Sequence, residues 1–386
     1  MEKNKVRVFV TTSHLSTVLI TLYAKSTYNS HTKDFLIVDT GNRRKELLQL
    51  ISETSEFHTW EKFSSFSDTV QSVYDFRPTL SRNFIRKIKY WPITKQFYNL
   101  LLNQYLKQRD IRYRKKLSAV IPNAPGSSVE LFLMSQTYLN RPLRQIFPDA
   151  SVSFMEHGIG DYFYVMNEQH PKSKMFAVFA NGYKNYLLNK RIKSDWVYEI
   201  TGLSDFHLLA QHLIKKHNRT LCLFEIPAIS KPIVFILLEA VDMYNVPESF
   251  WTDYLDHILE QLDSPQRFHF LLKTHPVQSK ISVVISEFFF QDKNLEYTLL
   301  ADDKLSSASA EVLFNLWFPN TEHVFCLFSS GCFYLSQLYK DKPITFWYST
   351  EFFSRYIKNA PPQYKIHFEE IRPLIEQVFA ERCKSY

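Results

Sequence analysis

The sequence predicts an α/β protein with two successive Rossmann-like domains, and three observations support this prediction. The chain has 386 residues, which exceeds the roughly 250 to 300 residues at which a single hydrophobic core stops growing. Strand and helix patterns alternate in both halves, as they do in parallel sheets covered by helices. Several strand patterns also end in short polar motifs, which is typical of ligand sites beyond the carboxyl ends of parallel strands.

The first half begins with a clear β-α-β-α alternation. Apolar, β-branched runs predict strands at residues 6–12, 35–40, 129–134 and 151–155, and periodic segments predict helices at residues 15–25, 44–52 and 138–146. A long helical region lies between them, and Pro92 is expected to kink or break it. Weak patterning near residue 205 marks the expected boundary between domain 1–205 and domain 206–386.

A second alternation follows in the other half of the chain. Strands are predicted at residues 220–226, 268–272, 323–328 and 344–348, and helices at residues 248–262, 281–289, 309–317 and 332–339. A closing helix is predicted at residues 368–383, with the option of packing back on the first domain. Two such domains facing each other would form a cleft between their sheet edges, and we expect the ligand there.

The composition indicates a cytoplasmic protein. The chain begins with MEKNK, followed directly by a strand pattern, without the features of a signal peptide. Its most apolar run, residues 232–240, has about half of the roughly 20 residues that a membrane span needs, so we expect a soluble or peripheral protein. The four cysteines, Cys222, Cys326, Cys332 and Cys383, lack CxxC spacing, which favours reduced thiols over a structural zinc site.

The net charge of +7 is unevenly spread. Between residues 82 and 116 Asp110 is the single acid, and the basic residues are Arg82, Arg86, Lys87, Lys89, Lys95, Lys107, Arg109, Arg112, Arg114, Lys115 and Lys116. A solvated helix face is one interpretation, and a binding surface for an acidic polymer or an anionic membrane is the other. No nucleic-acid-binding module is recognisable in the sequence.

The strand pattern at residues 151–155 ends in Glu156-His157-Gly158. A partly desolvated carboxylate at a strand end can have its pKa raised toward the range of a general base, and glycine lets a ligand approach. Glu156 is therefore the candidate base, although a glutamate that caps the following turn fits the same pattern. His157 either tunes this base, binds substrate or faces solvent, while Asp161 is interpreted as a turn or cap residue.

Two strand patterns of the second half also end in polar motifs. In Lys273-Thr274-His275-Pro276 the proline stops the strand and holds the imidazole at the sheet edge. There His275 can neutralise a phosphate leaving group or cap a backbone carbonyl. Ser329-Ser330-Gly331 precedes a helix pattern, and hydroxyls beside free helix amides form an anion pocket as readily as a simple N-cap.

The order of these motifs resembles that of the bacterial sialyltransferases, especially the capsule polysialyltransferases and the related lipooligosaccharide sialyltransferases. Those families carry an acidic-acidic-Gly motif, a His-Pro motif and a Ser-Ser motif in this order. Here the middle position of the first motif is His157, so the chain departs from the pattern there and keeps the leading carboxylate, Glu156.

The resemblance implies a GT-B architecture and an inverting transfer from CMP-sialic acid, with no cofactor and no metal. It implies that Glu156 is the base, and that the donor nucleotide is bound by His275, Pro276, Glu311, Ser329, Ser330 and Gly331. Such a transfer needs a base on the acceptor hydroxyl and charge compensation on the leaving phosphate, and these residues can supply both. The absence of an Asp-x-Asp motif agrees with metal-independent catalysis.

The basic segment then suggests a sialylated, polyanionic acceptor. The residues expected to bind it are His157, Gly158, Arg86, Lys87, Lys89, Arg109, Arg112, Arg114, Lys115 and Lys116. The expected partners are CMP-sialic acid, this acidic acceptor and the capsule machinery at the inner face of the inner membrane, without nucleic acid. Three alternatives stay open: transfer to a galactosyl lipooligosaccharide, another CMP-sugar (Kdo) transferase, and a non-enzymatic polyanion-binding protein.

Overall fold

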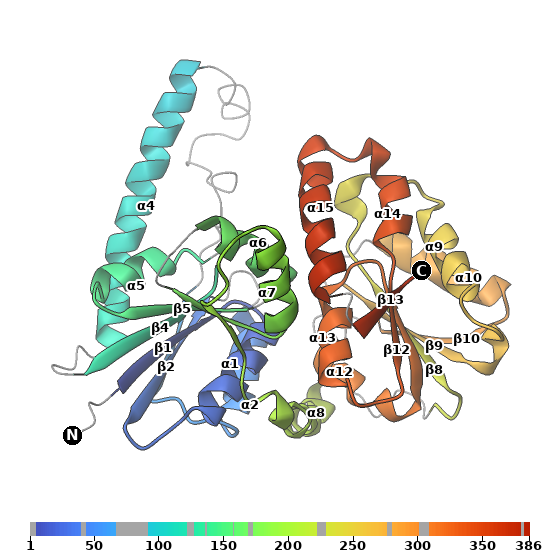
Figure 1. Ribbon diagram of the computed structural model, residues 1–386, viewed down its shortest axis with the longest axis horizontal. Helices are drawn as coiled ribbons and strands as arrows, with labels where there is room; N and C mark the ends of the chain where they lie inside the picture. The colour runs from blue at the N-terminus through green and yellow to red at the C-terminus, as the bar shows by residue number, and fades with distance from the viewer. Residues whose placement is uncertain are drawn as a thin grey trace. The chain divides into compact units, whose positions relative to one another are not determined.

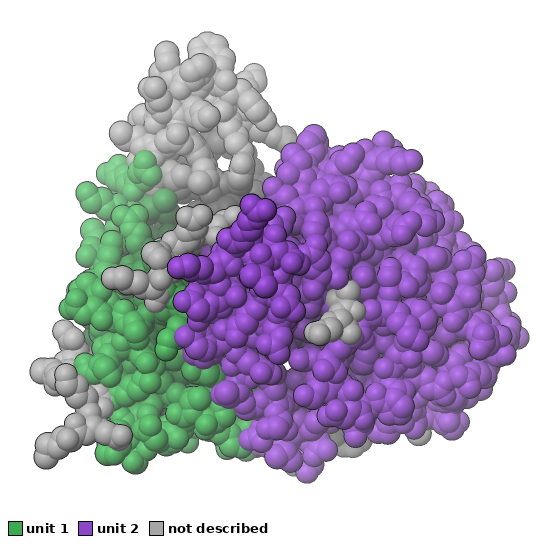
Figure 2. All heavy atoms as spheres, viewed as in Figure 1, with its two compact units in different colours: residues 1–157, 169–175 green, residues 158–168, 176–386 purple. Residues whose placement is uncertain are grey.

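A computed structural model shows two parallel sheets with helices around them (Figure 1). It describes residues 5–39, 44–66, 92–121, 127–135, 137–156, 158–168, 173–221, 229–275, 280–300, 309–379 and 382–386. The chain divides into two compact units, residues 1–157 with 169–175 and residues 158–168 with 176–386, coloured green and purple in Figure 2. The boundary expected near residue 205 stays a prediction.

The first sheet has the strand order β3-β2-β1-β4-β5-β6-β7. Its strands are β1 (Lys5–Thr11), β2 (Thr32–Asp39), β3 (Lys62–Phe66), β4 (Ser128–Leu133), β5 (Ser151–Met155), β6 (Lys174–Ala177) and β7 (Val197–Glu199). β1 pairs in parallel with β2 on one side and with β4 on the other, so the strand order reverses at β1. This is the doubly wound order of Rossmann folds. Val8, Phe9 and Val10 are fully buried, as expected for a central parallel strand.

Helices connect these strands. They are α1 (His14–Ser26), α2 (Arg44–Thr54), α4 (Pro92–Val120), α5 (Asn140–Ile146), α6 (Ile159–Glu168), α7 (Ala180–Asn189) and α8 (Phe206–Leu221). α1 begins with a capping box, in which Ser13 and Ser16 accept hydrogen bonds from each other's backbone N–H. Pro92, predicted as a kink or break, is the first residue of α4, a position where its missing N–H costs nothing.

A buried ionic cluster holds the first two strands together. Arg7 on β1 donates to both carboxylate oxygens of Asp34 on β2, with N–O distances of 2.6 Å each. His58 Nε2 lies 2.9 Å from Asp34 Oδ2, and Arg7 also donates to the Ala24 carbonyl of α1 at 3.1 Å. The cluster therefore fixes the first β-α-β unit, which the apolar pattern of the sequence alone did not reveal.

The second sheet has the order β10-β9-β8-β11-β12-β13. Its strands are β8 (Ile233–Leu238), β9 (His269–Thr274), β10 (Glu296–Leu300), β11 (Thr321–Cys326), β12 (Thr345–Tyr348) and β13 (Cys383–Ser385). All of these neighbours pair in parallel. Every residue of β8 is buried, and the strand order reverses at β8 as it does at β1.

The second sheet is covered by α9 (Phe250–Leu259), α10 (Lys280–Asp292), α12 (Ala310–Phe314), α13 (Ser330–Leu338), α14 (Thr350–Tyr356), α15 (Pro362–Leu374) and a π-helix (Ile375–Phe379). Aromatic residues of α9, including Phe250, Trp251 and Tyr254, fill its core. Short 3₁₀ helices occupy Leu203–Asp205, Asp242–Tyr244, Pro265–Arg267, Phe318–Asn320 and Ile357–Asn359.

Cys326, Cys332 and Cys383 are free and buried, which confirms the predicted reduced thiols at these positions; Cys222 lies outside the described residues.

The structure corrects three of the predicted elements. The strand predicted at residues 220–226 begins inside α8, and the rest of it lies outside the described residues; the strand that opens the second sheet is β8. The closing helix predicted at residues 368–383 is α15 followed by the π-helix, and Cys383 begins strand β13. The helix predicted at residues 309–317 is the five-residue α12.

Candidate functional site

Three neighbouring strands of the second sheet end in polar residues at one edge. β8 lies between β9 and β11, and all three run in parallel. His275 follows β9, Glu239 follows β8, and the segment 327–330 follows β11. The His275 N–H donates to the Leu238 carbonyl at 3.0 Å, which holds the turn after β9 against the end of β8. Two of the predicted polar motifs thus meet at one sheet edge.

Glu239 is a buried carboxylate between these two motifs, and the sequence analysis did not identify it. It accepts the backbone N–H of Leu327, at 3.0 and 3.2 Å from its two oxygens, and that of Phe328 at 3.0 Å. Burial raises the pKa of Glu239 to about 7, and the backbone hydrogen bonds to its carboxylate partly oppose this rise. Glu239 therefore fixes the segment that leads from β11 into α13.

That segment presents Ser329 and Ser330 at the N-terminus of α13. Ser329 is the N-cap, with extended backbone angles, and its hydroxyl accepts the Gly331 N–H at 3.2 Å. Ser330 and Gly331, predicted just before the helix, form its first turn. Ser329 and Ser330 are half-buried, so hydroxyls and helix amides lie at a partly accessible helix start, where anions bind readily.

Glu311 lies beside this helix start. It is in the first turn of α12, is 7% exposed, and accepts a hydrogen bond from Ser309 Oγ at 2.5 Å. A methyl group added at Gly331 would lie 3.4 Å from Ser329 Oγ and 3.6 Å from Glu311 Oε1. The structure thus brings together Glu311, Ser329 and Gly331, which the resemblance had assigned to the donor nucleotide.

The residues around His275 differ in exposure. His275 is exposed, whereas Thr274 and Lys273 before it are buried. Thr274 donates to the Leu300 carbonyl at 3.1 Å, and the Lys273 ammonium donates to the Thr274 carbonyl at 2.9 Å. The strand end is therefore anchored while the histidine can meet a ligand. Pro276 lies outside the described residues.

The predicted base sits at the end of β5 in the first sheet. Glu156 directly follows this strand and its side chain is fully buried. His157 lies outside the described residues. Gly158 has open space where a Cβ would lie, and its carbonyl accepts the Asp161 N–H at 3.1 Å. Asp161 is buried in the first turn of α6, which agrees with its interpretation as a turn or cap residue.

The described cations of the basic segment fall into two groups. The first group is engaged within the protein. Arg109 is 8% exposed, and its guanidinium lies 4.9 Å from the centre of the Tyr138 ring. Lys116 donates a hydrogen bond to the Ser65 carbonyl at 2.7 Å. These two side chains contribute to the packing of α4. Four others are exposed on α4: Lys107, Arg112, Arg114 and Lys115. Arg86, Lys87 and Lys89 lie outside the described residues.

Two further properties concern the described part of the chain. No cluster of three or more His, Cys, Asp or Glu side chains is placed there to hold a metal ion. None of the helices described is long and apolar enough to cross a membrane.

A comparison with protein families identifies the chain. The model of the alpha-2,8-polysialyltransferase family matches residues 7–348. The protein belongs to this family. It is therefore a sialyltransferase, and the resemblance inferred from the three motifs is confirmed at the level of the family. The matched region contains every residue to which a site role was assigned, from Arg86 to Gly331. Among curated proteins, none matches the chain.

Solved structures with a similar fold are known. The UDP-GlcNAc 2-epimerase of Methanocaldococcus jannaschii has 12% identity and a TM-score of 0.53, and the match covers 98% of this chain and 94% of that one. The ADP-heptose LPS heptosyltransferase II of E. coli has 10% identity and a TM-score of 0.41, with 97% and 99% covered. At such identities a likeness shows the fold alone, and the match with the Methanocaldococcus jannaschii structure confirms the predicted GT-B class.

Proposed function

We propose that this polysialyltransferase-family protein transfers sialic acid from CMP-sialic acid to a sialylated acceptor, with inversion and without a metal ion, in capsular polysaccharide synthesis. The observation that supports this most is that three strand ends come together at one edge of the second sheet. They bring His275 to the segment anchored by Glu239, in which Ser329 lies close to Glu311. These groups offer a cation or proton donor, hydroxyls and helix amides to a nucleotide phosphate, and a carboxylate to ribose hydroxyls.

In the proposed reaction the acceptor hydroxyl oxygen bonds to the anomeric carbon of the donor as the bond from that carbon to the phosphate oxygen breaks. The electron pair of the broken bond leaves with CMP, and the hydroxyl proton passes to Glu156. His275, Ser329 and Ser330 compensate the charge that grows on the phosphate, and Glu311 holds the ribose. Electrostatic stabilisation of this kind is usually the largest single contribution to catalysis.

We further propose that the exposed cations of α4 hold the acidic acceptor. Lys107 and Arg114 are seven residues apart, so they lie on the same side of the helix, with Lys115 next to that side and Arg112 toward the opposite side. Arg109 and Lys116 are left out of this surface because their side chains are engaged within the protein. Peripheral contact with the inner membrane and the capsule machinery stays a prediction.

The test measures CMP release by the purified protein with CMP-sialic acid and an oligosialic acceptor in the presence of EDTA. We expect turnover, and an NMR spectrum of the product with inverted anomeric configuration. Glu156→Gln and His275→Ala should each lower kcat by about 10²- to 10⁴-fold, the usual range for a general acid or base. The exposed Glu248→Gln serves as the matched control and should retain activity.

The alternatives predict other outcomes in the same assay. Turnover with galactosyl acceptors alone would favour the lipooligosaccharide enzyme, and turnover with CMP-Kdo alone would favour a Kdo transferase. Activity that appears only when a divalent cation is added would contradict the metal-independent mechanism. Acceptor binding without CMP release from any donor would contradict the proposed transfer.

A further inference from the structure

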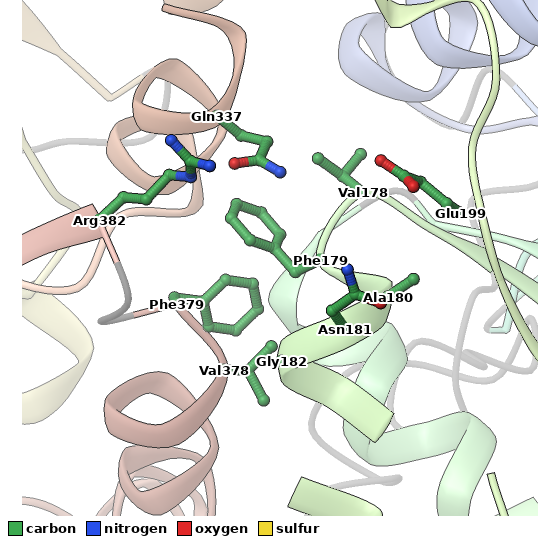
Figure 3. Close-up of a pocket in the computed structure, with 10 residues that line it drawn as sticks. All are labelled: Val178, Phe179, Ala180, Asn181, Gly182, Glu199, Gln337, Val378, Phe379 and Arg382. Atoms are coloured by element: carbon green, nitrogen blue, oxygen red, sulfur yellow. The ribbon is translucent and has the colours of Figure 1, made fainter. Parts of the chain in front are cut away.

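A cavity lies apart from the residues discussed so far, within the second unit. It has a volume of about 160 Å³ and lies where α7 begins, α13 ends and the π-helix passes (Figure 3). Its apolar wall includes Phe179 and Phe379, whose rings meet edge to face with centroids 4.7 Å apart. A Cβ at Gly182 would lie 2.7 Å from the Val378 carbonyl oxygen, so α7 and the π-helix are in close contact and this wall is built into the fold.

Four polar side chains line the same cavity: Arg382, Glu199, Gln337 and Asn181. Gln337 Oε1 is buried and accepts no hydrogen bond from the described residues. Over the same part of the chain, neither Arg382 nor Glu199 forms an ion pair. Arg382 and Glu199 are exposed, so their charges are accessible to a ligand. Buried polar groups are usually hydrogen-bonded, so the Gln337 oxygen calls for an explanation such as a ligand.

The cavity and Ser330 are connected through one helix. Ser330 is the first residue of α13 and Gln337 is its penultimate residue, so a rise of 1.5 Å per residue places about 10 Å between them along the helix axis. The cavity is therefore a separate site from the serine motif. It is also smaller than the roughly 300 to 1,000 Å³ of pockets that enclose whole small-molecule ligands, which favours one unit of a larger molecule.

The lining defines the chemistry of that unit. Arg382 favours a carboxylate, for which guanidinium is the preferred partner. Gln337 Oε1 and the Glu199 carboxylate accept hydrogen bonds, so they favour hydroxyl or amide N–H groups. The Phe179 ring suits a small apolar group. A sialyl unit carries a carboxylate, several hydroxyls and an acetamido group on one ring, and thus matches each of these features.

We infer that this cavity binds one sialyl unit of the acceptor chain at a distance from the serine motif. The inference rests on the proposed function for the identity of the chain, and it adds a binding site to which no role has been assigned. Such a site would retain a growing chain between additions, so it would act on the affinity for longer acceptors and leave the transfer step itself unchanged.

The test titrates the full-length protein with free N-acetylneuraminic acid, followed by saturation-transfer NMR. Arg382→Gln should weaken this binding about tenfold or more, the usual cost of losing a hydrogen bond to a charged partner. Arg355→Gln, a change at an exposed arginine of α14 that pairs with Glu351, is the matched control and should bind as the wild type does. Circular dichroism checks that both variants fold. Equal binding by all three proteins, or binding of phenylalanine in preference to the sugar acid, would overturn the inference.

A second measurement separates this inference from the proposed function. Arg382→Gln should release CMP with a short acceptor at the wild-type rate, while its KM for a long oligosialic acceptor rises several-fold. If the wild type and Arg382→Gln have the same KM for long acceptors, the cavity inference fails and the transferase stands. If the wild type releases no CMP with any acceptor, the proposed function fails, and the sugar-acid titration still decides whether the cavity binds a sialyl unit.

Discussion

The pKa of Glu239 leads to a prediction about folding stability. Its carboxyl has an ordinary pKa of 4.5, and burial raises this to about 7 in the folded protein. Between these two values the unfolded chain has lost the proton while the folded protein keeps it. The stability that Glu239 contributes is therefore fully present below pH 4.5 and is lost as the pH rises through 7. The full difference corresponds to roughly 3 kcal/mol, at about 1.4 kcal/mol per pKa unit.

Glu239→Gln removes this titration and keeps one carbonyl oxygen for the N–H groups of Leu327 and Phe328. The free energy of unfolding of the wild type, relative to that of the variant, should fall by roughly 2 to 3 kcal/mol between pH 5 and pH 8. Urea unfolding followed by tryptophan fluorescence measures this, because Trp251 is buried in the core of the second sheet. Other titrating groups cancel in the difference.

Two results would refute this reasoning. A difference between wild type and Glu239→Gln that does not change with pH would show that the carboxyl titrates alike in both states. A difference that changes in the opposite direction would mean that the backbone hydrogen bonds outweigh burial and lower the pKa. The control is the exposed Glu248→Gln, which should follow the wild type at every pH.

Three further predictions follow from described contacts. Gly331→Ala should melt at the wild-type temperature, because the added methyl group lies at ordinary contact distances from Ser329 and Glu311. It should nevertheless weaken CMP binding several-fold in calorimetry, and an unchanged affinity would remove this position from the donor site. Asp34→Ala should lose roughly 3 to 5 kcal/mol in urea unfolding, because it leaves the Arg7 guanidinium buried and unpaired; a loss below about 1 kcal/mol would contradict that role. Changing Lys107 and Arg114 together to Gln should raise the acceptor KM and flatten its dependence on salt, whereas the exposed Lys358→Gln should not.

With the exception of β8, the sequence predicted the central strands of the two sheets better than their edge strands. Strands such as β1 and β9 are continuous buried runs, which a pattern of apolar residues identifies directly. β3, β7 and β10 were missed, and each keeps most of its residues exposed or half-buried. A short strand that buries so few side chains leaves no clear periodicity, and only its pairing with a neighbour makes it a strand.

The sequence also predicted only part of the candidate site. His275, Ser329 and Glu311 were identified because they belong to motifs with known order, and the structure brings Ser329 and Glu311 together. Glu239 belongs to no such motif. Its signal was nevertheless present, because a lone acid directly after the buried run 233–238 repeats the pattern of Glu156 after β5. The length of this run excludes a membrane span, but length alone does not indicate the role of the acid that follows it.

The topology explains why Glu239 is important at this edge of the sheet. In doubly wound sheets, ligands bind where the strand order reverses, and in the second sheet this point is β8, with β9 on one side and β11 on the other. The chain order of the motifs cannot reveal this, because His275 and Ser329 follow two strands, β9 and β11, that are neighbours only through β8. A carboxylate at that point would oppose an anionic ligand if it were free. Its hydrogen bonds to the N–H groups of Leu327 and Phe328 and its raised pKa reduce that opposition. Under the proposed function, the hydroxyls of Ser329 and Ser330 are then left to meet the phosphate of the donor.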